Sequence, residues 1–175
     1  MGSPVSSAFP IEVNGISDAT DISVGRYYAC SITDSEEVKC WGRNNYGQLG
    51  NGGISVHNPT PTKVIGGVND IVDLSAGWNT VCAVQSSSSN GEVYCWGRNA
   101  RGQTGVGYSS QVVSTPTKVI TSSGTLSNVV DVTAGYNHSC ALLDDGRVTC
   151  WGSDDYGELG ISSSNDSTTR AGEFV

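Results

Sequence analysis

Hydrophobic and polar residues alternate along several short stretches of this chain. Residues 71–76 and 129–134 both show this period of two, which is typical of strands that are buried on one side. No convincing stretch repeats its apolar residues at the spacing of an amphipathic helix. The pattern therefore predicts an all-β protein built from short strands.

Cysteine pairs lie on predicted hairpins. Cys140 and Cys150 share one face if Asp144-Asp145-Gly146 forms a three-residue turn with Gly146 in the left-handed conformation. This register places the two cysteines directly opposite each other. The same register applies to Cys30 with Cys40 and to Cys82 with Cys95, where a run of serines lengthens only the hairpin tip.

The hairpins recur with a fixed period. Cys-Trp-Gly begins at residues 40, 95 and 150, and Gly-Gln-Leu-Gly or a close variant follows each time. Thr-Pro-Thr-Lys-Val-Ile occurs at 60–65 and again at 115–120. A unit of 55 residues with about four short strands and glycine-rich turns is typical of a β-propeller blade.

The repeats predict a single domain of three four-stranded blades. Phe9–Val13 aligns with the Thr-Pro-Thr-Lys-Val element, and Arg170–Val175 falls where a further copy is expected. Both segments are therefore candidates for the fourth strand of the last blade. We interpret residues 1–8 as a cloning remnant or linker and expect the domain at 9–175, with blade cores at about 16–65, 68–120 and 126–175.

The third unit reads Ala-Gly-Tyr-Asn-His-Ser-Cys-Ala-Leu-Leu-Asp-Asp-Gly-Arg-Val-Thr-Cys-Trp-Gly, with Tyr-Gly-Glu-Leu-Gly shortly after it. This segment resembles the repeat of the regulator of chromosome condensation family, and all three units match over about residues 10–170. The resemblance implies a β-propeller, seven-bladed in other members, that recognises proteins through its blade loops. Members include a nucleotide exchange factor, ubiquitin-ligase modules and a bacterial β-lactamase inhibitor.

Three blades are too few to close a ring, because closed propellers have about four or more. We expect the chain either to be part of a larger propeller or to complete a ring by oligomerisation. A head-to-tail homodimer with six blades is the favoured arrangement, in which Pro10–Val13 completes the last blade of the neighbouring copy.

Composition narrows the classes of partner. The chain has 9 Lys and Arg against 17 Asp and Glu, a formal charge of −8, so it offers no basic surface for nucleic acid. No apolar run is long enough to span a membrane. We therefore predict a protein partner, without nucleic acid or membrane binding.

The six cysteines have two open interpretations. Facing positions favour three disulfides, which predict an extracellular or periplasmic location. Reduced cysteines that pack as small core residues are the alternative. Zinc is disfavoured because clustered Cys and His ligands are absent, and we expect neither a metal nor a cofactor.

Two sets of loop residues are candidates for protein binding. The residues that follow the first glycine of each repeat differ between repeats, although the residues around them recur. Arg and aromatic side chains on a rigid scaffold are typical of binding hot spots. This set consists of Arg26, Tyr27, Trp78, Asn79, Tyr136 and Asn137. A second set, in the turns after Trp-Gly, consists of Tyr46, Arg101 and Tyr156. The alternative is that all are solvated turn residues.

Catalytic chemistry has little support in the sequence. His57 and His138 are the only histidines, and the pairs Asp144-Asp145 and Asp154-Asp155 are explained by turn chemistry. We therefore predict a non-enzymatic protein-binding module from an exported bacterial protein. The alternatives are a structural spacer in a larger exported protein and, less favoured, a propeller hydrolase or lyase.

Overall fold

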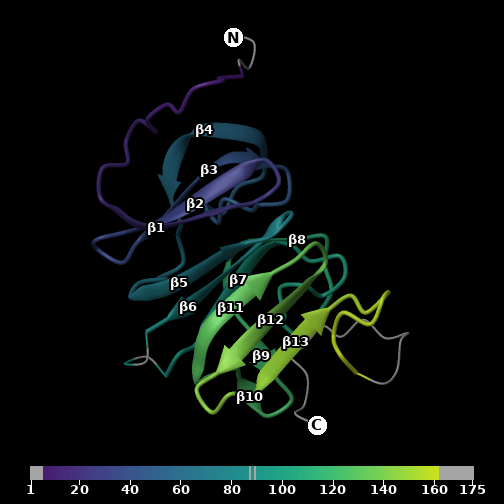
Figure 1. Cartoon of the computed structure of the whole chain (residues 1–175). Helices are drawn as coiled ribbons and strands as arrows, with labels where there is room; N and C mark the ends of the chain where they lie inside the picture. Colours follow the sequence, from purple (N-terminus) through teal and green to yellow (C-terminus); the bar gives the residue numbers. More distant parts are fainter. Residues whose placement is uncertain (1–5, 87, 89, 162–175) are drawn as a thin grey trace.

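The chain folds into three antiparallel sheets that follow one another in sequence order (Figure 1). The computed structural model describes residues 6–86, 88 and 90–161, and this part of the chain contains no α-helix. The strands of the first sheet are β1 (Ala19–Val24), β2 (Tyr28–Thr33), β3 (Val38–Asn44) and β4 (Ser55–Lys63). Those of the second are β5 (Ile71–Ala76), β6 (Thr80–Gln85), β7 (Val93–Arg98) and β8 (Val112–Lys118).

The third sheet has three strands within the described residues, namely β11 (Val129–Ala134), β12 (His138–Leu143) and β13 (Val148–Gly152). A small hairpin of β9 (Ile120–Thr121) and β10 (Gly124–Thr125) precedes it. The predicted strand at 170–175 lies outside the described residues. The prediction of an all-β propeller fold is confirmed, with the first two blades four-stranded as expected.

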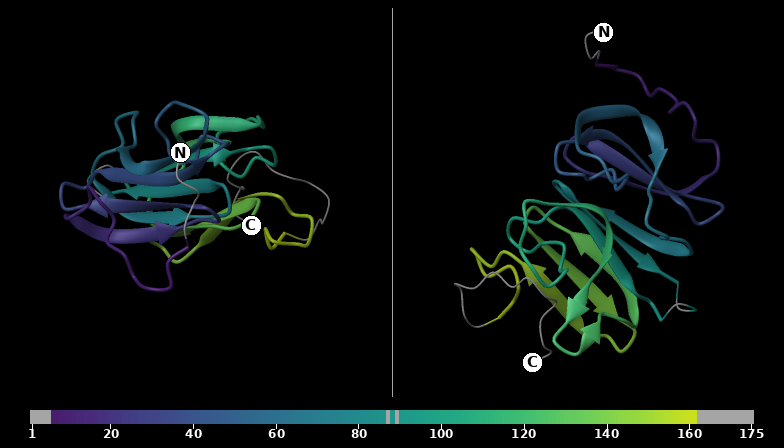
Figure 2. Two further views of the ribbon diagram at one scale, coloured as in Figure 1. Left: turned by 90° about the horizontal axis from the view of Figure 1, so that it is seen from above. Right: turned by 180° about the vertical axis from the view of Figure 1, so that it is seen from behind.

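The sheets pack face to face like the blades of a propeller. The second sheet lies between the first and the third in Figure 1 and in the right view of Figure 2, and β5 contacts both β1 and β11. The first strands of the three sheets therefore lie innermost and next to one another. We call each sheet a blade, the side toward the preceding blade its near face and the side toward the following blade its far face.

The predicted N-terminal strand does not form within the chain. Phe9–Val13 pairs with none of the described strands, and the side chains of Phe9 and Ile11 are exposed. The sheet that lacks a fourth strand among the described residues is the third, at the other end of the molecule from the N-terminal segment (Figure 1). The pairing of this segment with a neighbouring copy stays a prediction.

The hairpin register is as predicted. Cys140 lies opposite Cys150 in the β12–β13 ladder, and Gly146 has a φ of 87° in the turn between the strands. Each of the three predicted cysteine pairs forms a disulfide, with Cα–Cα distances of 4.1, 4.2 and 4.0 Å for Cys30–Cys40, Cys82–Cys95 and Cys140–Cys150. Alternation and turn chemistry were sufficient to predict this register, because hairpin pairing is local in sequence.

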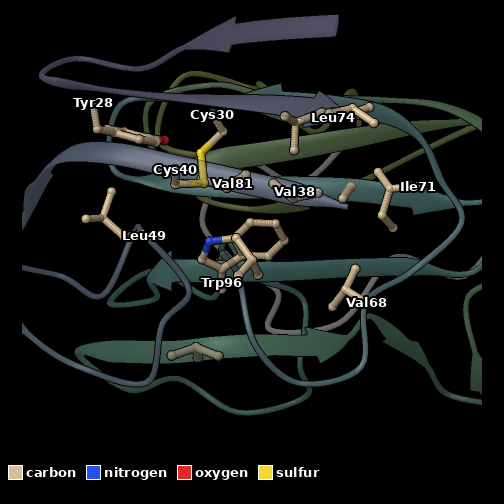
Figure 3. Close-up of a cluster of buried hydrophobic side chains, with 14 of the residues drawn as sticks. Tyr28, Cys30, Val38, Cys40, Leu49, Val68, Ile71, Leu74, Val81 and Trp96 are labelled. Carbon is tan, nitrogen blue, oxygen red and sulfur yellow. A yellow bond between two sulfur atoms is a disulfide. The ribbon is translucent and has the colours of Figure 1, made fainter. Parts of the chain in front are cut away.

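A tryptophan from each following blade is buried against the preceding one. Trp96 is fully buried, and its indole N–H donates a 3.0 Å hydrogen bond to the carbonyl oxygen of Gln48. Figure 3 shows this indole inside the cluster between the first two blades, beside the Cys30–Cys40 disulfide. Trp151 makes the same 3.0 Å bond to the carbonyl oxygen of Gln103.

A glycine that recurs at the end of each innermost strand allows the blades to approach closely. A Cβ atom at Gly77 would lie 2.4 Å from the carbonyl oxygen of Gly135 in the next blade. We expect Gly77→Ala to lower the free energy of unfolding by about 1–3 kcal/mol, because the blades must separate to admit the methyl group. Urea unfolding measures this loss.

Gly53→Ala is the matched control. Neither glycine has a positive φ, and a Cβ at Gly53 would meet only the side-chain oxygen of Asn51, at 3.5 Å. Its free energy of unfolding should stay within about 1 kcal/mol of the parent value. Equal losses in both variants would contradict the close-approach explanation.

Candidate protein-binding face

Both sets of candidate loops lie at the same edge of the blades. The loops after the innermost strands cover residues 25–28, 77–80 and 135–138, and the turns after the third strands begin at 44, 99 and 154. In antiparallel sheets, these connections leave from the same end of the strands. Hydrogen bonds from Gln48 to Asn79 and from Gln103 to Asn137 join turns to loops across neighbouring blades. We call this edge the loop face.

Backbone hydrogen bonds give the three loops a common conformation. The N–H groups of Gly25, Gly77 and Gly135 donate to the carbonyl oxygens three residues later, at 2.9, 2.8 and 2.9 Å. Tyr28 reinforces the second loop, because its hydroxyl lies 3.0 Å from the oxygen of Gly77 and 2.9 Å from that of Thr80. Burial raises the pKa of the Tyr28 hydroxyl far above its usual value, so this donor keeps its proton.

The first residue after each of these glycines contributes to one continuous row of side chains. The Arg26 guanidinium carbon lies 4.1 Å from the centroid of the Trp78 ring, and Trp78 meets Tyr136 edge to face with ring centroids 4.1 Å apart. The row thus crosses all three blades. It borders a hollow of about 300 Å³ that the adjoining glycines and the ends of the innermost strands also line.

The second residue of each loop has a different environment. Tyr27 is 58% exposed, and its ring centroid lies 4.8 Å from the guanidinium carbon of Arg26. Asn79 is buried, and its side-chain oxygen accepts a bond from Gln48, so this side chain makes a contact between two blades. Asn137 is half-buried and accepts the equivalent bond from Gln103. These two asparagines join blades because their short amide side chains fit beside the preceding turn.

The second candidate set lies in the turns at the same edge of the blades. The backbone N–H groups of Tyr46, Arg101 and Tyr156 donate to the side chain two residues later, which directs their own side chains away from the turn. Tyr156 is 94% exposed, Arg101 is exposed and Tyr46 is half-buried. The Arg98 guanidinium carbon lies 5.4 Å from the Tyr46 ring centroid.

Arg43 and Arg98 are loop-face residues that the sequence analysis missed. Each follows Cys-Trp-Gly at the same position of its repeat, and this recurrence was the available signal. The loop face therefore carries the arginines 26, 43, 98 and 101 on a chain whose net charge is −8. The negative net charge of the whole chain did not indicate this local surface of arginine and aromatic side chains.

The residues with catalytic potential are separated or engaged in turns. His57 lies in β4 of the first blade and His138 in β12 of the third. Asp145 accepts bonds from the backbone and side chain of Arg147, while Asp154 accepts one from the backbone of Leu159. The expected turn roles of these carboxylates are confirmed.

Neither a metal site nor a membrane-spanning helix is found in the described part of the chain. Between residues 6 and 161, apart from 87 and 89, no three His, Cys, Asp or Glu side chains form a group that could hold a metal ion. The same part of the chain has no helix long and apolar enough to cross a membrane.

The chain consists of propeller blades, with tryptophans that recur between successive blades and variable loops on one edge. Together these features define part of a propeller built from repeats. Models of the regulator of chromosome condensation (RCC1) repeat match residues 37–84 and 90–142 and, in a second version, residues 19–48, 71–103 and 129–158. The chain belongs to the RCC1 repeat family.

Curated relatives are much longer than this chain. The ultraviolet-B receptor UVR8 of Arabidopsis thaliana is 34% identical over 131 residues, which cover 74% of this chain and 28% of the receptor. The probable E3 ubiquitin-protein ligase HERC4 of Homo sapiens is 29% identical over 170 residues, which cover 94% of this chain and 15% of the ligase.

Solved structures agree with the fold. Prp20p from Saccharomyces cerevisiae superposes with a TM-score of 0.78 at 21% identity, over 90% of this chain and 38% of that one. Human WBSCR16 gives a TM-score of 0.74 at 23% identity, over 87% and 37% respectively. The chain thus spans well under half the length of these relatives.

Proposed function

We propose that the chain is a non-enzymatic module that binds a protein partner through its loop face. The row of Arg26, Trp78 and Tyr136 carries this proposal. Tryptophan, tyrosine and arginine are the residues that most often dominate binding energy at protein interfaces. The rigid scaffold holds them in place before binding, which lowers the entropic cost of association.

Relatives support a role in recognition. They include a receptor and ubiquitin ligases, and the structural neighbour Prp20p has binding properties to Gsp1p and histones. Arginine and aromatic side chains together fit a protein surface that presents carboxylates and apolar groups, since arginine makes two-pronged bonds to carboxylates. We infer a partner with such a surface.

The three disulfides support an oxidising location for the module. Cytosolic thiols are normally kept reduced, whereas disulfides persist in exported proteins. We therefore place the protein outside the cell or in the periplasm and seek its partner there.

Photo-cross-linking is used to identify the partner. Alanine variants then test whether the loop face binds it. A benzophenone amino acid at position 136 is expected to capture one protein from the extracellular or periplasmic fraction, whereas the same probe at position 108 does not. With that protein purified, Trp78→Ala should raise the Kd about 30-fold, equivalent to about 2 kcal/mol, by titration calorimetry.

Tyr108→Ala is the matched control. Tyr108 is 54% exposed, similar to Tyr136 at 48%, but it lies outside the aromatic row. Its Kd should stay within about twofold of the parent value, as for most surface substitutions. If alanine at Arg26, Trp78 and Tyr136 leaves the Kd unchanged, the loop-face proposal is rejected and the spacer alternative gains support.

A further inference from the structure

Ion pairs divide the lysines and arginines of this chain into two groups. Among the described residues, five of these side chains pair with a carboxylate, namely Lys39, Lys63, Arg101, Lys118 and Arg147. The other three in this part of the chain, Arg26, Arg43 and Arg98, make no ion pair and lie against aromatic rings of the loop face. The unneutralised cations of the described residues are therefore all loop-face arginines.

The loop face of the first two blades has no carboxylate of its own. Asp and Glu are absent from all of its loops and turns, over residues 25–28, 44–53, 77–80 and 98–111. The hairpin tips lie at the opposite edge of the same blades, and they carry Asp34, Glu36, Glu37 and Glu92. The loop face is therefore locally positive, although the net charge of the chain is −8.

Arg98 lies in the middle blade, where the preceding and following blades are both present. Its side chain is half-buried, and its guanidinium carbon lies 5.4 Å from the ring centroid of Tyr46 in the first blade. The Nε atom is buried and has no hydrogen-bond partner. A buried donor without an acceptor is costly and rare in folded proteins, so it points to a group that the chain itself does not supply.

Arg26 and Arg98 both adjoin Trp78. The guanidinium carbon of Arg26 lies 4.1 Å from the centroid of the Trp78 ring, and the backbone N–H of Arg98 donates a 2.9 Å bond to the carbonyl oxygen of Asn79, the next residue. The hollow of about 300 Å³ borders the same tryptophan, and Arg26 is the charged residue in its otherwise uncharged lining. An uncharged hollow and two unpaired arginines therefore share one part of the loop face.

Lys118 of the same blade shows what Arg98 lacks. The Lys118 ammonium nitrogen lies 5.8 Å from the ring centroid of Tyr94 and 2.7 Å from a carboxylate oxygen of Glu92. The hydrogen bond from Glu92 raises the pKa of Lys118 above its usual value. Arg98 has the corresponding contact with a tyrosine ring but has no carboxylate. The group that would complete its surroundings is therefore a carboxylate.

We propose that the loop face binds an acidic segment of the partner protein, whose carboxylates pair with Arg98 and Arg26 while an apolar side chain of the same segment enters the hollow. This inference rests on the proposed protein-binding function and names the chemistry of the bound segment. Arginine binds a carboxylate through two parallel hydrogen bonds, and contact with the aromatic rings orients both guanidinium groups before binding. The acidic hairpin tips repel the same segment, so charge directs it to the loop face.

A phage-displayed library of random dodecapeptides is the probe, because it assumes no particular spacing of the charges. We expect the peptides enriched on the parent chain to combine Asp or Glu with a large apolar residue. With the tightest peptide made synthetically, Arg98→Gln and Arg26→Gln should each raise the Kd about 10-fold by titration calorimetry. Binding to the parent chain should also weaken when the ionic strength rises from about 0.1 to about 1 M, since the Debye length falls from about 10 to about 3 Å.

Lys118→Gln is the matched control, because it removes the same charge beside a tyrosine ring but at the opposite edge of the blade. Its Kd should stay within about twofold of the parent value. Circular dichroism checks that all variants are folded.

Three outcomes would overturn the inference. Enriched peptides that lack Asp and Glu but lose binding to Trp78→Ala would reject the acidic segment and leave the loop face as a protein-binding site. Acidic peptides that bind Arg98→Gln and the parent chain equally, or a selection that enriches no loop-face peptide, would also reject it, while the cross-linking experiment decides the proposed function separately. A parent chain that dimerises by light scattering, and becomes monomeric in Arg98→Gln, would replace the partner by a second copy.

Discussion

Replacing Trp96 by alanine is expected to lower the free energy of unfolding by about 3–5 kcal/mol, the range for large aromatic residues removed from a core. The indole is fully buried between the first two blades, and its N–H donates to the carbonyl of Gln48. A Cβ added to Gly50 would lie 2.8 Å from this indole nitrogen, which shows how closely the turn packs on the ring. Truncation leaves a cavity and an unpaired carbonyl at the same place. Urea unfolding followed by fluorescence measures the loss.

Trp41→Ala provides the comparison within the same chain. Trp41 occupies the equivalent position in its repeat but is only half-buried, because none of the described blades packs against it. We expect a loss of about 1–2 kcal/mol, in line with partial burial. Equal losses for the two tryptophans would contradict the inter-blade role of Trp96.

Removing the central disulfide should have the second largest effect. Replacing Cys82 and Cys95 together by alanine is expected to cost about 3 kcal/mol, the value for a closed loop of about this length. The two cysteines are separated by 13 residues and are fully buried. The change therefore also removes sulfur atoms from a packed interface. Thermal and urea unfolding under non-reducing conditions measure the combined loss.

The terminal disulfide is the matched pair for this experiment. Cys140 and Cys150 are 10 positions apart, so the entropic contribution is similar, but both cysteines are only half-buried. Their double alanine variant should lose less stability than the variant that lacks the central disulfide. If dithiothreitol leaves the unfolding midpoint of the parent chain unchanged, the cysteines do not stabilise the fold through disulfides.

The site was only partly predictable, because its residues come together across blades. The positions after each repeat glycine could be identified from the sequence, because they differ between repeats while the residues around them recur. Their environments could not be identified: Trp78 and Asn79 are neighbours in sequence, yet Trp78 is half-buried in the row with Arg26 while Asn79 is buried against Gln48. Which of two adjacent loop residues reaches the surface depends on the turn of the preceding blade.

The sequence by itself determined the blades. Cys140 faces Cys150 because alternation and a glycine turn set a hairpin register over a few residues, and repetition of that local signal at residues 40, 95 and 150 defined the architecture. Only the tertiary structure decided which side chains are covered. Val38 and Val148 are identical in local sequence role, but one is 1% and the other 62% exposed, because burial is set by the neighbouring blade and not by the strand itself. The row of Arg26, Trp78 and Tyr136 has the same origin, since packing of the blades brings together residues that are more than 50 positions apart.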